Sequence, residues 1–171
     1  MELCQAFVPI NNAKHLLKSF DCGISEMNTF LSQFAQKHAK LGLSRTSVLP
    51  VDQLVNNKHP VAAYYTLAVA TVSKLAIPSE KNLPRYPIPV ALLARLAIDV
   101  NYQNQGLGAK TLITALRHTV RLCDEGLSVH GLVLDVLNNA ALSFYQRFDF
   151  FFPFTDDPMR LFVPMGALRN I

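Results

Sequence analysis

One turn restricts what this chain can fold into more than any other feature of its sequence. Residues 90–100 read VALLARLAIDV, an apolar run interrupted by Arg95 and Asp99, which predicts a central strand. Residues 103–110 read QNQGLGAK and hold two glycines. Residues 106–125 then carry apolar side chains at helical spacing, namely Leu112, Leu116, Val120 and Cys123. A strand, a glycine turn and a helix therefore follow one another directly.

Such a turn favours a phosphate ligand. Free backbone N–H groups converge at a helix N-terminus, and the helix dipole favours negative charge there. Glycines let the main chain approach a ligand closely. The pattern is neither G-x-x-x-x-G-K-[ST] nor G-x-G-x-x-G, so an ATP P-loop and a Rossmann site are disfavoured. We expect a phosphate or pyrophosphate site, with a purely structural turn as the alternative.

The remaining sequence predicts further strands and helices around this unit. Strands are expected at residues 2–8, 46–51, 60–73, 129–137, 148–154 and 160–164. Helices are expected at residues 25–41, with Ser25 as the N-cap, and at residues 138–147; Gly126 ends the helix of residues 106–125. Four prolines predict a loop over residues 74–89. One domain spanning residues 1–171, with a mixed sheet covered by helices, is the expected organisation.

Composition narrows the class of protein. Half of the residues are hydrophobic and 16% are charged, which indicates a packed core rather than disorder. The longest apolar stretch, residues 61–72, is shorter than the about 20 residues of a membrane helix, and no secretory signal is expected. Three cysteines without a CxxC pair predict no disulfide framework and no metal site, and favour a cytoplasmic setting. The net charge of +4 suits either a polyanionic partner or an ordinary basic enzyme.

The strand, the sequence Gln103-x-x-Gly106-x-Gly108 and the helix after it resemble the GNAT acetyltransferase superfamily, whose signature is [QR]-x-x-G-x-[GA]. The resemblance implies an α/β (α+β) GNAT fold, in which helices flank a mixed central sheet of six to seven strands. It also implies acetyl-CoA as cofactor, with its pyrophosphate on the turn. The turn residues assigned to the cofactor in this way are Gln103, Gln105, Gly106, Leu107, Gly108, Ala109 and Lys110. The strand residues whose main chain would pair with the pantetheine arm are Leu96, Ala97, Ile98 and Val100.

A second segment supports the same superfamily. Residues 138–150 read NNAALSFYQRFDF and resemble its N-x-x-A-x-x-F-Y-x-x-F-G-F motif. The resemblance implies that Asn138 contacts the cofactor and that Tyr145 is the general acid for the departing thiolate. The alternative for Tyr145 is simple packing beside Phe144. Asp149 replaces the usual glycine, and we expect a positive φ there.

The likeness extends over roughly residues 18–163 to the GNAT toxins of bacterial type II toxin–antitoxin systems. It rests on the shared order of several stretches, among them FDCG at 20–23, GLSRT at 42–46, LPRYPIPV at 83–90 and DDP at 156–158. The resemblance implies acetylation of the α-amine of aminoacyl-tRNA, a block of translation, and a small antitoxin partner, usually ribbon-helix-helix. It also makes a homodimer possible. The alternative is a GNAT enzyme acting on a small amine or a protein N-terminus; the intact motifs argue against a non-catalytic acyl-CoA-binding module.

The sequence identifies the residues around the acceptor substrate less clearly than those around the cofactor. An ester-linked amino acid has a weakly basic amine, so water can take its proton, and no histidine or glutamate is placed convincingly as a base. An N–H near Ala97 or Ile98 is expected to hold the oxyanion. Phosphates of tRNA need cations, and the candidates are Lys37, Lys40, Arg45, Arg85, Arg95 and Arg147. Arg95 interrupts an apolar strand, so it should face a cleft or pair with an acid such as Asp99.

Overall fold

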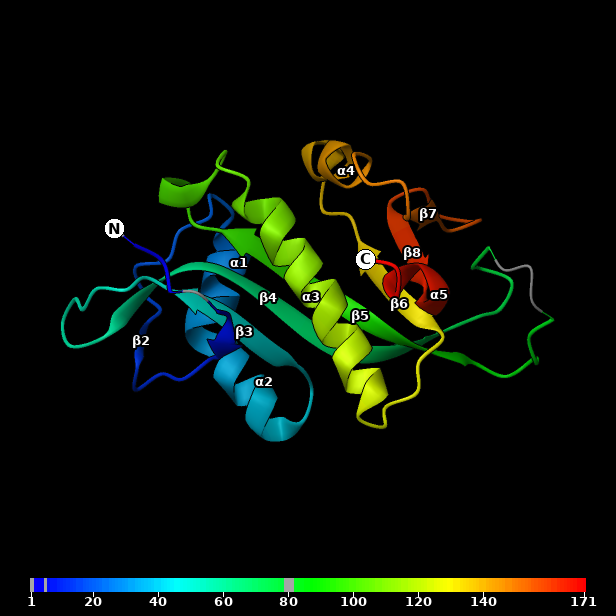
Figure 1. Cartoon of the computed structure of the whole chain (residues 1–171), viewed down its shortest axis with the longest axis horizontal. Helices are drawn as coiled ribbons and strands as arrows, with labels where there is room; N and C mark the ends of the chain where they lie inside the picture. The colour runs from blue at the N-terminus through cyan, green and yellow to red at the C-terminus, as the bar shows by residue number, and fades with distance from the viewer. Residues whose placement is uncertain (1, 5, 79–81) are drawn as a thin grey trace. The chain divides into compact units, whose positions relative to one another are not determined.

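The computed structural model describes residues 2–4, 6–78 and 82–171 (Figure 1). Two compact units make up the chain: Met1–Ala68 with Arg95–Thr114, and Val69–Ala94 with Ala115–Ile171. Strands β4 (His59–Val72) and β5 (Ile88–Ile98) and helix α3 (Leu107–Asp124) contribute residues to both units. Within the described residues, no helix is both long enough and apolar enough to cross a bilayer.

The first unit is built on antiparallel strands. Strand β1 (Val8–Pro9) pairs with β3 (Arg45–Pro50), which pairs with β4, and β2 (His15–Leu16) runs parallel to the start of β4. The predicted strand at 2–8 reaches regular pairing only at Val8; Leu3 forms an isolated bridge with Val51, and residue 5 lies outside the described residues. The core of this unit is apolar and aromatic and contains Leu17, Phe20, Phe30, Leu31, Val48, Val61, Tyr64 and Ala97.

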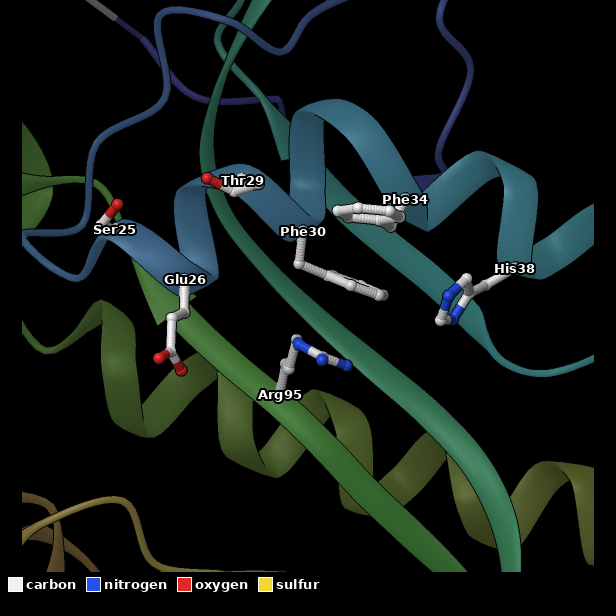
Figure 2. A pocket seen from close by; sticks show the side chains of 7 residues that line it. All are labelled: Ser25, Glu26, Thr29, Phe30, Phe34, His38 and Arg95. Carbon is white, nitrogen blue, oxygen red and sulfur yellow. The ribbon is translucent and has the colours of Figure 1, made fainter.

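The predicted helix at 25–41 is interrupted. It consists of α1 (Ser25–Thr29), a π-helical turn η1 (Phe30–Phe34) and α2 (Ala35–Leu41). Its N-cap is Ile24, without a side-chain capping bond, so Ser25 is the first helical residue rather than the cap. Figures 1 and 2 place this helical segment on the face of β4 and β5 opposite to the one that the first turns of α3 cover.

The second unit contains the remaining strands. Strand β6 (Gly131–Asp135) runs parallel to β5, with Ala91 opposite Leu132, and antiparallel to β8 (Arg160–Pro164). Strand β7 (Phe152–Pro153) pairs with β8 and is shorter than the predicted strand at 148–154. Helices α4 (Asn139–Tyr145) and α5 (Met165–Leu168) belong to this unit. Its core contains Val72, Ile77, Ile88, Val90, Val133, Phe154 and Phe162.

The strands follow the order β1-β3-β4-β5-β6-β8-β7, with β2 beside β4. The described residues thus form an eight-stranded mixed sheet, where six to seven strands were predicted. The additional strand is β2, which no predicted strand covered. The predicted loop at 74–89 ends earlier, since β5 begins at Ile88, and residues 79–81 lie outside the described residues. Strand β5 ends at Ile98, so Val100 starts the 3-10 turn η2 (Val100–Tyr102) instead of ending the strand. Gly126, at φ 128°, follows the end of α3 as predicted.

Candidate functional site

The glycine turn between η2 and α3 belongs to the first unit. Asn104 (φ 62°) and Gly106 (φ 80°) both take the left-handed conformation. A Cβ placed on Gly106 would meet no atom within 4 Å, so φ rather than crowding requires glycine there. Leu107 is buried against Leu49 and Ala62, which fixes the start of α3 on the sheet. The turn is therefore anchored at its far end and open at Gly106.

The first amides of α3 have no acceptor within their own helix, as at every helix N-terminus. The amide of Lys110 is the first to bond back, to the Gly106 carbonyl at 3.2 Å. Gln105, Gly106 and Lys110 are exposed, and Gly108 and Ala109 are half-buried. An exposed row of N–H donors at a helix start fits the charge and shape of a pyrophosphate.

The side chain of Gln103 bonds within the protein. Its Nε2 donates to the carbonyl of Cys22 at 3.0 Å and to that of Ile98 at 2.8 Å. The motif's first residue thus ties the turn to the end of β5 and to the segment before α1. A signal for this bond was absent from the sequence, because Cys22 and Gln103 are far apart in the chain.

Asp99 is only 5% exposed and lies at the same junction. Its carboxylate accepts the backbone N–H of Asp21, and both the backbone N–H and the side-chain Nδ2 of Asn101. The carboxylate of Asp21 in turn accepts from the Gly23 N–H and from Asn28 Nδ2, and these bonds lower the pKa of Asp21. The segment before α1 is therefore fixed to the residues that lead into the glycine turn.

Arg95 faces a pocket and is held by an aromatic ring. Its guanidinium carbon lies 3.6 Å from the centre of the Phe30 ring. Of the two arrangements predicted for Arg95, the pocket-facing one is confirmed, while the Asp99 carboxylate binds backbone and side-chain amides. The pocket has a volume of about 420 Å³ (Figure 2) and is lined by Ser25, Glu26, Thr29, Phe30, Phe34, His38 and Arg95.

Sequence reasoning missed most of this lining. Of the lining residues, the sequence indicated Arg95, and Ser25 only as a helix N-cap. The available signal was the spacing: Glu26, Phe30, Phe34 and His38 recur at every fourth position. Phe34 is 43% exposed, so part of its ring is open to the pocket and to solvent.

Tyr145 and Asn138 belong to the second unit. Tyr145 ends α4, is 8% exposed, and packs edge-on against Phe144 at 5.1 Å and Phe151 at 5.5 Å between ring centres. Burial raises the pKa of Tyr145 to about 12, so its hydroxyl keeps its proton at neutral pH. Asn138 is the N-cap of α4, and its Oδ1 accepts the Ala141 N–H at 2.9 Å.

The prediction of a positive φ at Asp149 is wrong, because the positive-φ residues other than glycine in the described part of the chain are Asn56, Asn57 and Asn104. The chain turns after α4 without a left-handed residue at this position. Aspartate therefore replaces glycine there without backbone strain.

The six predicted cations are divided between the two units. Lys37, Lys40 and Arg45 are exposed on α2 and at the start of β3, and Arg95 lines the pocket, all within the first unit. Arg85 and Arg147 are exposed residues of the second unit. The guanidinium of Arg147 lies 4.9 Å from the ring centre of Phe144. Among these cations, Arg95 lines the pocket described above.

Comparison with known proteins places these features in a family, although no protein-family model matches the chain. A tRNA-acetylating toxin of Mycobacterium tuberculosis (strain ATCC 25618 / H37Rv) is 32% identical over 155 residues, which cover 90% of this chain and 88% of the relative. A Tyr-to-Phe mutant of KacT superposes with a TM-score of 0.87 at 27% identity, with 99% of both chains covered.

Two structures of AtaT are also similar. AtaT complexed with acetyl-methionyl-tRNAfMet has a TM-score of 0.84 at 28% identity, covering 96% of this chain and 97% of that one. A Tyr-to-Phe mutant of AtaT bound to the C-terminus of the antitoxin AtaR and to acetyl-CoA has a TM-score of 0.78 at 26% identity, with 96% of both chains covered. Because the relative of M. tuberculosis matches nearly the whole chain and the solved folds agree along its length, this chain belongs to the tRNA-acetylating GNAT toxins of bacterial toxin–antitoxin systems.

Proposed function

We infer that the protein is an acetyl-CoA-dependent N-acetyltransferase that acetylates the α-amine of aminoacyl-tRNA and thereby blocks translation. The observation that carries this conclusion is the near full-length match to a tRNA-acetylating toxin, together with an open glycine turn at the start of α3. When bound, acetyl-CoA supplies the acetyl group as a thioester.

The residues of the turn fit the cofactor's charge. We propose that the backbone N–H groups from Gly106 to Ala109 hold the pyrophosphate, because they are donors without helical acceptors at or beside a Cβ-free residue. The exposed side chain of Lys110 is the proposed cation at the same site. The side chain of Gln103 stabilises this turn by donating hydrogen bonds to the carbonyls of Cys22 and Ile98. The main chain of Leu96, Ala97 and Ile98 is the proposed partner of the pantetheine amides, and an N–H near Ala97 or Ile98 the proposed oxyanion donor.

Tyr145 is the proposed general acid. With its pKa raised to about 12 by burial, its Oη carries a proton throughout the physiological range and can give it to a sulfur that leaves as thiolate. Asn138 keeps its Nδ2 group after its Oδ1 has capped α4, and this group is the proposed cofactor contact. The acceptor amine is weakly basic, so a protein base is not required for its deprotonation.

Further partners are proposed on the same basis. The candidate tRNA contacts are Lys37, Lys40, Arg45 and Arg95 of the first unit and Arg85 and Arg147 of the second.

Since solved relatives bind an antitoxin segment, we propose that a small antitoxin, of ribbon-helix-helix type, holds this protein inactive. We also propose that the toxin forms a homodimer. Because charged tRNA is the proposed substrate, we propose that the protein acts in the cytoplasm.

The decisive experiment exposes a complete charged tRNA pool to the purified protein with radiolabelled acetyl-CoA. Mass spectrometry should find acetyl groups on the amino acid, and a cell-free translation reaction should stop only when acetyl-CoA is present. Label found on small amines or protein N-termini, with unmodified aminoacyl-tRNA and undisturbed translation, would refute the toxin function in favour of another GNAT activity.

A further inference from the structure

We propose that the pocket beside Arg95 receives the side chain of the amino acid esterified to tRNA, and that it selects charged tRNAs bearing bulky apolar or aromatic amino acids. This inference rests on the proposed function and adds the feature by which substrates are distinguished. It is carried by the geometry of the helical segment from Ser25 to Leu41 and by the chemistry of its exposed face.

The π-helical turn aligns the pocket's wall. On a regular α-helix, every fourth residue is displaced by about 40° around the axis, because a turn holds 3.6 residues. Here the Ala35 N–H bonds to the Phe30 carbonyl, an i→i+5 bond that widens the turn between Phe30 and Phe34. In the wider turn, four residues cover slightly less than one full turn, so the fourth residue is displaced in the opposite direction and the two displacements offset each other. As a result, Glu26, Phe30, Phe34 and His38 all line one pocket. π-Helical turns are concentrated at functional sites, which fits this role.

The wall is aromatic and its charges are balanced. The ring of His38 lies edge-on to Phe30, at 5.3 Å between ring centres, and to Phe34, at 6.3 Å. The guanidinium of Arg95 stacks on Phe30 and gives the opposite wall a flat surface, as Figure 2 shows. Glu26 lines the same pocket, so its carboxylate opposes the charge of Arg95. A pocket lined by aromatic rings, with that of Phe34 exposed, and with no excess charge favours apolar and planar groups over acidic ones.

The position of Arg95 in the chain indicates which part of the substrate fills the pocket. Arg95 directly precedes Leu96–Ile98, the strand segment proposed to hold the pantetheine arm, and both lie in the first unit. The amine that attacks the thioester must therefore lie next to this pocket, with its own side chain the nearest group to fill it. The volume of about 420 Å³ lies within the range of small-molecule sites and has room for an aromatic side chain. The terminal adenine of tRNA is the competing occupant, because bases also stack on aromatic and guanidinium planes.

The test uses one tRNA body charged with phenylalanine, leucine, glycine or aspartate, and measures kcat/KM for acetylation with radiolabelled acetyl-CoA. We expect the phenylalanine and leucine forms to exceed the glycine and aspartate forms by about tenfold or more, the discrimination typical of apolar pockets. Phe34→Ala should remove most of this preference by lowering only the rates for bulky amino acids. The control is Leu41→Ala, a 72% exposed residue of α2 outside the pocket, which should keep the wild-type preference.

Equal rates for all four amino acids in the wild type would overturn the inference. So would a Phe34→Ala variant that slows all four forms equally, because that pattern belongs to an adenine site or to a structural defect; thermal unfolding of the variant separates these two. If the protein binds acetyl-CoA in calorimetry but acetylates no charged tRNA, the proposed function is wrong. The assignment of the pocket to an aminoacyl side chain is then wrong as well.

Discussion

The carboxylate of Asp99 accepts the backbone N–H of Asp21 at 3.1 Å, joining two segments that are 78 positions apart in the chain. The carbonyl of Asp21 also accepts the Val100 N–H at 2.8 Å. Through these bonds the loop before α1, which leads into the pocket wall, is tied to the residues that lead into the glycine turn. The proposed acceptor pocket and the proposed cofactor turn of the first unit are thus linked by one hydrogen-bond network.

Replacing Asp99 with asparagine should loosen this network. One carboxylate oxygen becomes an NH2 group that faces backbone N–H donors, so at least one buried donor loses its acceptor, at a cost of about 1–3 kcal/mol. We expect a lower free energy of unfolding in urea and a raised KM for acetyl-CoA. Asp156→Asn, at an exposed position, is the matched control. A fully stable Asp99→Asn variant with wild-type kinetics would show that this network neither stabilises the fold nor positions the glycine turn.

Gly106→Ala tests the glycine turn. The left-handed φ of 80° costs an alanine about 1–2 kcal/mol, although no atom crowds the position. The turn should distort, and we expect the Kd for acetyl-CoA in calorimetry to rise about tenfold, with the sheet still folded.

The chain offers a matched control in Gly166→Ala. Gly166 has open space around it but no left-handed φ, and it lies in helix α5. Alanine there should leave acetyl-CoA binding unchanged. Equal affinities of the Gly106→Ala and wild-type proteins would argue that the turn is purely structural.

Tyr145→Phe separates packing from proton donation. The phenylalanine ring keeps the contacts with Phe144 and Phe151, so the Kd for acetyl-CoA and the thermal stability should stay close to wild type. Turnover should fall about 100-fold or more, the usual contribution of a general acid. Tyr86→Phe, at a 67% exposed position, is the control.

The pH profile gives a second readout on Tyr145. Because burial raises its pKa to about 12, its hydroxyl stays protonated and no loss of kcat from its ionisation is expected between about pH 6 and 9. If kcat fell as the pH was lowered from 9, and this fall was absent in Tyr145→Phe, the active form of Tyr145 would be the phenolate instead of the phenol.

The sequence predicted those parts of the structure that depend on the backbone preferences of neighbouring residues. The glycine turn, the helix after it and the glycine at its end follow from backbone preferences, and the structure has them at the predicted places. The fold class followed from motif resemblance and is confirmed. The pocket-facing alternative for Arg95 followed from one charge in an apolar strand.

The features that depend on distant pairing could not be read from the sequence. Nothing near Gln103 indicates that its amide binds the Cys22 carbonyl, and Asp99 had a plausible cation close by in Arg95. The π-helical turn at Phe30–Phe34 arises from one shifted backbone bond, for which residue types carry no local signal. The same limit explains the short β7, where the predicted strand begins with aromatic residues that pack on one another around Phe148 and Phe151.

Mild acid should weaken the fold through His15. This side chain is 5% exposed, and burial with the nearby charges of His59 and Lys14 lowers its pKa below the usual 6.5. Its Nδ1 accepts the Asn11 N–H at 3.0 Å, which requires the neutral ring. As the pH falls through 6.5, the unfolded chain takes up a proton that the folded chain resists, so stability is lost between 6.5 and the lowered folded pKa.

The measurement is the free energy of unfolding in urea at a series of pH values from about 8 to 5. His118, whose pKa burial also lowers, contributes in the same direction, so His15→Asn should reduce the slope below pH 6.5 without abolishing it. Asparagine keeps an acceptor for the Asn11 N–H, and His38→Asn, a residue without this bond, is the control. An identical slope in wild type and His15→Asn would show that His15 titrates equally in both states and that its burial carries no pH-dependent stability.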